Sequence, residues 1–242
     1  MSSRLITCAL CFVLAVCSAS AGQERDYLQD LATSRVILNV LRKEGTSGSL
    51  EYWTQCRSPQ LFPQLPTVRT LPENWQGFAA SGLQEMLIDD PRMHVTEDTD
   101  GTVRMAEGVP EDLLNVAISH ISFPEVYEAR KAQGFILAAP EVKSFMKSHG
   151  IAWLPTGSPL GPFVIPTAGM PHISGDLNNV TVRQALDYVL KTFPGFWIYE
   201  TCSDDVHNRV SIYFFTYGGR LGGVPGGGIR VEIPFQAAGD AR

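Results

Sequence analysis

The chain has 242 residues, of which 44% are apolar, and its formal net charge at pH 7 is −6. This length suffices for one large globular domain or two small ones. There is no basic stripe and no run of Lys or Arg, which argues against a nucleic-acid partner, because neutralising phosphates supplies most non-specific affinity.

Residues 1–21 have the order of a secretory signal peptide. Arg4 is followed by an apolar run and then by small residues up to Ala21, which predicts cleavage after Ala21 and a periplasmic or secreted protein. The residues before Cys17 also loosely resemble a lipobox, so a lipoprotein anchored at Cys17 is the alternative. No stretch after the leader reaches the length of a membrane span, and we expect the mature chain not to cross a membrane.

The first half of the mature chain is expected to mix helices and strands. The apolar periodicity and the turn residues predict the following elements: a helix over 27–43, a strand over 50–53, a long connection over 54–77 with a short strand near 68–71, and a helix over 111–121.

Residues 79–106 and 182–215 share one pattern. Each segment has an apolar helical stripe, a Pro that ends it, an alternating strand, a turn rich in Asp or Asn, and a return strand. At an offset of 103 positions Leu83 corresponds to Leu186 and Pro91 to Pro194. This similarity indicates two copies of one helix-plus-hairpin unit. Convergence is the alternative, because every amphipathic helix followed by a hairpin has these periods.

The remaining segments complete the predicted organisation. A helix is expected over 140–149, an extended connection over 150–171, a flexible Gly-rich tail over 218–228 and a possible edge strand over 229–233. The chain therefore divides as follows: signal peptide 1–21, first module 22–121, connector 122–171, second module 172–217 and tail 218–242. The fold class is α+β, with two small modules, each a sheet covered by helices on one face.

The stretch Ile173–Asp187, with the sequence ISGDLNNVTVRQALD, resembles a known module. Its strand, its Val-Thr-Val-x-x-Ala-Leu helix start and the following hairpin are similar to the short N-terminal (STN-like) module of secretins and TonB-dependent receptors. The segment from Leu83 to Met105 resembles it more weakly. Most of the mature chain loosely resembles a group of exported bacterial proteins with two such modules, and the resemblance implies binding to, or stacking against, other proteins.

Two cysteines, Cys56 and Cys202, remain after the leader. Each follows a predicted strand, and an oxidising compartment permits one disulfide between them. Such a bond would fix the relative orientation of the two modules. Two separate buried thiols are the alternative.

Acidic side chains cluster at the two predicted hairpin turns: Glu97, Asp98 and Asp100 in the first, and Asp204, Asp205 and His207 in the second. Carboxylates in such a cluster suit acid–base catalysis or calcium binding, but Asp and Asn are also favoured in turns for their own hydrogen bonds. We interpret them as turn residues. No catalytic residue, metal site or cofactor site is predicted, because no catalytic motif or zinc-ligand spacing is present.

Aromatic residues form the remaining candidate site. Six aromatic residues are candidates for a glycan or peptide groove, although such residues more often complete a core: Trp53, Trp75, Trp153 and Trp197, with Tyr52 and Tyr199. Trp197 and Tyr199 alternate with Ile198 on a predicted strand and share one face of it. That face is either covered by another element or is a binding surface.

The sequence thus predicts an exported protein-interaction or assembly module of the bacterial envelope, without enzymatic activity or cofactor. Its expected partner is another envelope protein. The alternative is a secreted hydrolase that acts on an envelope or extracellular polymer through a carboxylate site. Paired carboxylates in a cleft would favour the hydrolase, and acids confined to exposed turns would favour the binding module.

Overall fold

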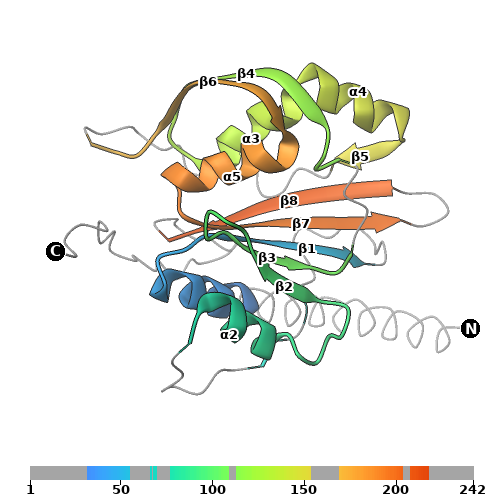
Figure 1. Ribbon diagram of the computed structural model, residues 1–242. Coiled ribbons are helices and arrows are strands. Elements are labelled where there is room, and N and C mark those ends of the chain that lie inside the picture. Colours follow the sequence, from blue (N-terminus) through green and yellow to red (C-terminus); the bar gives the residue numbers. More distant parts are fainter. Residues whose placement is uncertain are drawn as a thin grey trace, which may run out of the picture.

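A computed structural model describes residues 32–54, 66, 68–69, 77–108, 113–153, 169–203 and 208–217. A six-stranded sheet lies at the centre of the molecule, with helices on both faces and a second, two-stranded sheet outside them (Figure 1). The mixture of helices and strands confirms the predicted α+β class.

The first half contributes two helices and three strands. These are a helix whose described part covers 32–43, β1 (Gly48–Thr54), α2 (Ala79–Met86), β2 (His94–Glu97) and β3 (Val103–Ala106). The predicted helix over 27–43 is confirmed within its described part, and so is the strand predicted over 50–53. Of the strand predicted near 68–71, the described residues 68 and 69 belong to no regular element.

The second half contributes the remaining elements: β4 (Ala117–Val126), α3 (Ala129–Ala138), α4 (Pro140–Ser148), β5 (Ile151–Trp153), β6 (Ile173–Thr181), α5 (Val182–Thr192), β7 (Gly195–Ser203) and β8 (Asn208–Thr216). The helix predicted over 140–149 is confirmed as α4. The helix predicted over 111–121 is wrong, because residues 117–126 form β4, which pairs with β6 in an antiparallel ladder.

Both hairpins belong to the same sheet, whose strand order is β2-β3-β1-β7-β8-β5. In the first half, β1 lies parallel to β3, the second strand of the β2–β3 hairpin. In the second half, β5 lies parallel to β8, the second strand of the β7–β8 hairpin. The two halves therefore share one topology, in which a helix and a hairpin are completed by an earlier strand. Common origin stays a prediction.

The structure differs from the predicted arrangement of two separate sheets. Strand β1 pairs with β3 on one side and, over seven residues, with β7 on the other. It thereby joins the two hairpins into one sheet. Strand β4 also crosses the predicted boundary after residue 121 and pairs with β6, so residues of the predicted connector pack with the second module.

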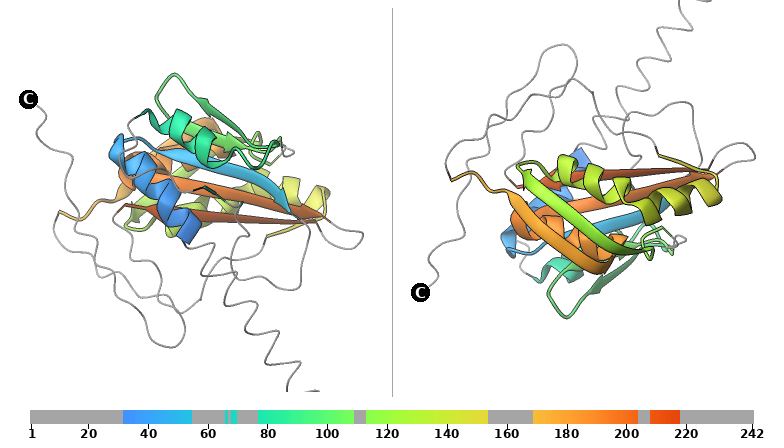
Figure 2. Two further views of the ribbon diagram at one scale, coloured as in Figure 1. Left: turned by 90° about the horizontal axis from the view of Figure 1, so that it is seen from below. Right: turned by 90° about the horizontal axis from the view of Figure 1, so that it is seen from above.

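Strand β7 separates two hydrophobic cores because its side chains alternate between the faces of the sheet. Phe196 and Ile198 pack with helix 32–43 and α2 on one face, whereas Trp197 and Tyr199 pack with α3, α4 and α5 on the other. Figure 2 shows the two helix layers from below and from above. The central sheet is therefore covered on both faces.

The two cores also correct the correspondence between the repeated segments. In the first half, Met93 and Val95 share the core of their own helix, α2. In the second half, the β7 residues in the core of α5 are Trp197 and Tyr199, not Phe196 and Ile198. The offset of 103 positions thus aligns the two helices, α2 and α5. In the strands, however, the residues that face these helices lie one position later in the second half than this offset predicts.

Candidate functional site

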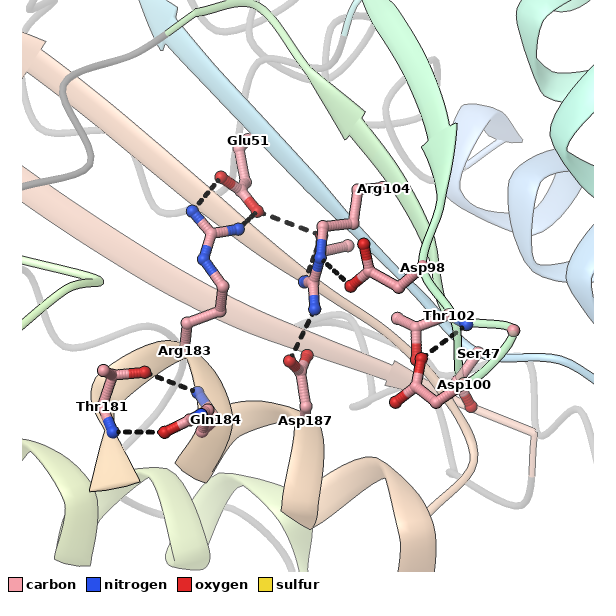
Figure 3. A network of polar contacts seen from close by, with 12 residues as sticks. Ser47, Glu51, Asp98, Asp100, Thr102, Arg104, Thr181, Arg183, Gln184 and Asp187 are labelled. Carbon is pink, nitrogen blue, oxygen red and sulfur yellow. Dashed lines mark hydrogen bonds and ion pairs between the residues drawn. The ribbon is translucent and has the colours of Figure 1, made fainter. Parts of the chain in front are cut away.

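A network of polar side chains lies between the sheet and the start of α5 (Figure 3). Glu51, on β1, is only 1% exposed. Its carboxylate receives two hydrogen bonds from the guanidinium of Arg183, one of them from Nη2 to Oε2 at 3.0 Å. The ion pair connects residues that are 132 positions apart and belong to different halves of the chain.

Arg104, on β3, makes the second connection between the halves. Its Nε donates to Asp98 Oδ2 at 2.6 Å, and its Nη2 donates to Asp187 Oδ2 on α5 at 2.8 Å. Asp187 also accepts a hydrogen bond from the indole Nε1 of Trp197 at 2.9 Å. The carboxylate of Asp187 therefore holds α5 to both β3 and β7.

Ser49 joins the two ion pairs into one network. Its Oγ donates a hydrogen bond to Glu51 Oε1 at 3.1 Å. The same Oγ accepts a hydrogen bond from Nη1 of Arg104 at 3.4 Å. Ser49 and Glu51 point to the same face of β1 as the neighbouring Trp197 and Tyr199 of β7, because they are their register partners. The network thus fills the part of this face that faces the N-terminal end of α5.

The start of α5 has a local cause in the sequence. Thr181 caps the helix by accepting a hydrogen bond from the backbone N–H of Gln184 at 3.2 Å, and the Gln184 side chain accepts from the backbone N–H of Thr181 at 2.9 Å. This capping box fixes where the helix begins. Arg183 and Asp187, four positions apart, consequently lie on one side of the first turns and reach the sheet together.

Burial raises the pKa of Glu51 above its ordinary value, and the charge and hydrogen bonds of Arg183 oppose this rise. A carboxyl with a raised pKa is a candidate proton donor when substrate can reach it. Here the carboxylate is covered, and both of its oxygens are engaged by Arg183. The arrangement therefore suits fixing β1 against α5 rather than proton transfer.

The acids of the first predicted cluster lie at the turn between β2 and β3, but they do not converge. Glu97 and Asp100 are exposed, and Asp98 is bound to Arg104. Asp100 accepts a hydrogen bond from the backbone N–H of Thr102 at 3.1 Å. Hydrogen bonds with Thr102 lower the pKa of Asp100, as expected for a turn residue.

The second predicted cluster, Asp204, Asp205 and His207, lies outside the described residues. Among the residues that are described, no three His, Cys, Asp or Glu side chains lie close enough together to hold a metal ion.

The predicted binding surface at Trp197 and Tyr199 is covered. The two residues are 0% and 2% exposed, because α3, α4 and α5 pack over this face of β7. The sequence analysis gave two alternatives for this face, and the one in which another element covers it is confirmed.

Two tryptophans of the proposed groove remain accessible. Trp53 is 39% exposed and Trp153 is 38% exposed. The two residues lie in one row across the sheet, because Trp53 is the register partner of Thr201 and Trp153 is the register partner of Val210. Thr201 and Val210 are partners of each other, lie between the two tryptophans and are buried. They therefore do not form a continuous aromatic surface. Trp75 lies outside the described residues.

Cys202, near the end of β7, is disulfide-bonded. Its register partner on β1 is Thr54, and Cys56 follows Thr54 by two positions. Cys56 lies outside the described residues, so its pairing with Cys202 stays a prediction.

Sequence reasoning missed the network residues Ser49, Glu51, Arg104, Arg183 and Asp187 as a group. One signal was present, namely an acid between apolar residues in the strand sequence SLEYW. A buried acid needs a cationic partner, but the sequence does not identify Arg183 as that partner.

None of the described helices has both the length and the apolar character needed to cross a bilayer. Comparison with family models, curated proteins and solved structures found no match to this chain.

Proposed function

We propose that this chain is an exported protein-interaction or assembly module of the bacterial envelope and has no catalytic role. The observation that carries the proposal is the use of its acidic side chains. Glu51 and Asp187 are bound by arginines inside the molecule, whereas Glu97, at the end of β2, and Asp100, in the following turn, are exposed. Acids at these places suit structural and surface roles.

The leader sequence and the STN-like helix start support the same proposal. In the chain, Thr181 and Gln184 of that helix start form the cap of α5, and Arg183 binds the first half. The motif residues thus fix α5 against the first half, and a surface held in place before binding loses less conformational entropy when a partner binds. The hydrolase alternative needs two carboxylates facing a cleft, and the acids just described do not meet this requirement.

Affinity isolation tests the proposal. The tagged mature protein is incubated with solubilised envelope from the source bacterium, with and without an excess of untagged protein. We expect one partner in near-equal amount that the untagged protein displaces. A search that recovers no displaceable partner would contradict the proposal.

A second assay addresses the hydrolase alternative. The purified protein is incubated with envelope polysaccharide, beside a variant that carries Glu97→Gln and Asp100→Asn. We expect no release of soluble fragments by either protein. Fragment release that the double substitution abolishes would establish the hydrolase instead.

A further inference from the structure

The two edges of the central sheet differ in how they are closed. At the β2 edge, the N–H of Val95 donates to the Gln84 side chain of α2 at 3.1 Å. At the other edge, β5 pairs with β8 only as far as Trp153 and Val210, whereas β8 continues to Thr216. Figure 1 shows the short strand β5 beside one end of β8. Within the described residues, the C-terminal part of β8 is therefore an edge of the sheet.

The direction of the backbone groups along β8 follows from its pairing with β7. The register runs through all nine residues of β8 without a shift, so residues alternate between those bonded to β7 and those whose N–H and C=O point outward. The N–H of Tyr217 donates to the carbonyl of Pro194 at 2.8 Å, which places Tyr217 in the first set. Phe214 and Thr216 therefore direct their N–H and C=O groups away from β7.

The side chains and one further hydrogen bond agree with this assignment. Ile212 and Phe214 pack in the core of α3, α4 and α5, whereas Tyr213 and Phe215 pack in the opposite core, so the alternation along β8 is unbroken. The carbonyl oxygen of Ile212 accepts a hydrogen bond from Nε2 of Gln133 on α3 at 3.1 Å. An outward carbonyl at Ile212 is the result expected from the register with β7.

We define the β8 edge as the outward side of Phe214–Thr216. Phe214 and Thr216 are half-buried, and no hydrogen bond to their outward groups is found among the residues that the structure describes. The amide of Gln133 beside this edge is also incomplete, because Gln133 is 1% exposed and its Oε1 is buried without a hydrogen-bond partner. A buried acceptor without a donor is destabilising. These groups together indicate that another segment of backbone belongs beside β8.

The C-terminal tail contains a segment with the pattern of a strand. Residues 229–233, with the sequence IRVEI, alternate apolar and charged residues, and Pro234 follows them. They lie outside the described residues. The Gly-rich stretch 218–228 connects them to β8, and this composition is typical of flexible linkers. A segment tethered in this way has a high effective concentration at its own edge, which favours it over a separate molecule.

From these observations we infer that residues 229–233 pair with the β8 edge as an additional, antiparallel strand of the central sheet. A return through one loop gives an antiparallel neighbour. The added strand closes the edge against pairing with strands of other molecules. This inference concerns the tail and does not depend on the proposed interaction function.

The apolar side of the tail strand determines its register. Gln133 connects α3 to the edge at Ile212, so α3 lies on the face of the sheet to which Phe214 also belongs. The apolar residues of the tail belong on this covered face. Val231 is then the register partner of Phe214, and the charged residues of the tail strand lie on the opposite face.

Amide hydrogen exchange of the full mature chain, followed by NMR, tests the inference. The N–H groups of Tyr213 and Phe215 bond to β7 and should exchange slowly whenever the protein is folded. Those of Phe214 and Thr216 should exchange slowly only if a further segment pairs with the β8 edge. We expect all four amides to be protected. Rapid exchange of Phe214 and Thr216 beside slow exchange of the other two would overturn the inference.

Two matched variants identify the tail as the segment that pairs. Val231→Lys places a charge on the apolar side of the tail strand, whereas Glu232→Lys places the same side chain on its opposite side. We expect Val231→Lys to accelerate exchange at Phe214 and Thr216 at least about tenfold, and Glu232→Lys to accelerate it less than about threefold. The amides that bond to β7 should stay slow in both variants, which confirms that the chain remains folded.

Three other outcomes would reject this assignment. Protection of the β8 edge that Val231→Lys leaves unchanged would assign the edge to another segment of the chain. Protection that decreases when the protein is diluted would assign it to a second copy of the chain. Equal acceleration by Val231→Lys and Glu232→Lys would contradict the proposed face of the strand.

Discussion

Removing one member of the Glu51–Arg183 pair is expected to cost far more stability than removing both. In Arg183→Met, the carboxylate of Glu51 stays buried and keeps only the hydrogen bond from Ser49. Breaking a buried ion pair in this way costs about 3–5 kcal/mol of unfolding free energy. In Glu51→Leu, the Arg183 side chain is already 15% exposed and can turn toward water, so we expect a smaller loss of about 1–3 kcal/mol.

The double variant, with Glu51→Leu and Arg183→Met, replaces the pair by apolar side chains. Such replacements are often nearly neutral, so we expect the two single losses to exceed the double loss by at least about 2 kcal/mol. The measurement is urea unfolding of the oxidised protein, followed by circular dichroism, for the four proteins of the cycle. Losses that add to within about 0.5 kcal/mol would refute a direct interaction between the two residues.

The pH dependence of the same variants provides an independent check. Burial raises the pKa of Glu51 in the folded chain, so the folded state binds the Glu51 proton more readily than the unfolded state. Stability from such a group increases as the pH falls through the folded pKa. Removing Arg183 raises this pKa further, so the deficit of Arg183→Met should shrink between about pH 7.5 and about pH 5. The double variant lacks the carboxylate and should not show this recovery.

Three further predictions concern the backbone and the disulfide. Gly195→Ala should lower the unfolding free energy by more than about 2 kcal/mol, because the added Cβ would lie 2.0 Å from a carbonyl oxygen of β8. The matched control is Gly134→Ala in α3, where no atom lies within 4 Å of the new Cβ. This substitution should raise the unfolding free energy by about 0.5–1 kcal/mol. Equal effects of the two substitutions in denaturant unfolding would contradict the prediction. Thr181→Ala removes the cap of α5 and should cost about 1 kcal/mol in the same assay; an unchanged unfolding midpoint would speak against the cap. Non-reducing peptide mapping should link Cys202 to Cys56, and a different partner for Cys202 would disprove the pairing.

Locally determined elements could be predicted from the sequence. The apolar stripe of residues 182–193 predicts a helix, and α5 spans Val182–Thr192. Its cap, its apolar face and the Pro that follows it all lie within a few positions of one another. The hairpin of β7 and β8 was predictable for the same reason, because the two strands are neighbours in the chain.

Strand β4 could not be identified in this way. The spacing of Leu113, Leu114 and Ile118 fits a helix as well as any other structure, and local periodicity favoured the helix. Of these residues only Ile118 belongs to β4, and its partner is Val180 of β6, which comes much later in the chain. A ladder with so distant a strand leaves little signal in the local sequence.

The polar network was missed for the same physical reason. Arg104 and Asp187 are 83 positions apart, and each is an ordinary charged residue of an amphipathic segment. Only the pairing of β1 with β7 brings their elements together. The candidate functional residues are therefore a product of the topology, and the acids of the hairpin turn were the ones that local spacing could identify.

The central place of β1 has a consequence for how the chain folds. The core beneath the first hairpin includes Phe196 and Ile198 of β7, and Ser47 bonds to Gly195 across 148 positions. The first half therefore cannot bury its own core until most of the chain is present. Because contacts at such sequence separation form slowly, folding of both halves should occur as one late cooperative step, after β7 has become available. Late folding of this kind fits the export that we propose, because a translocation channel passes chains that have not yet folded.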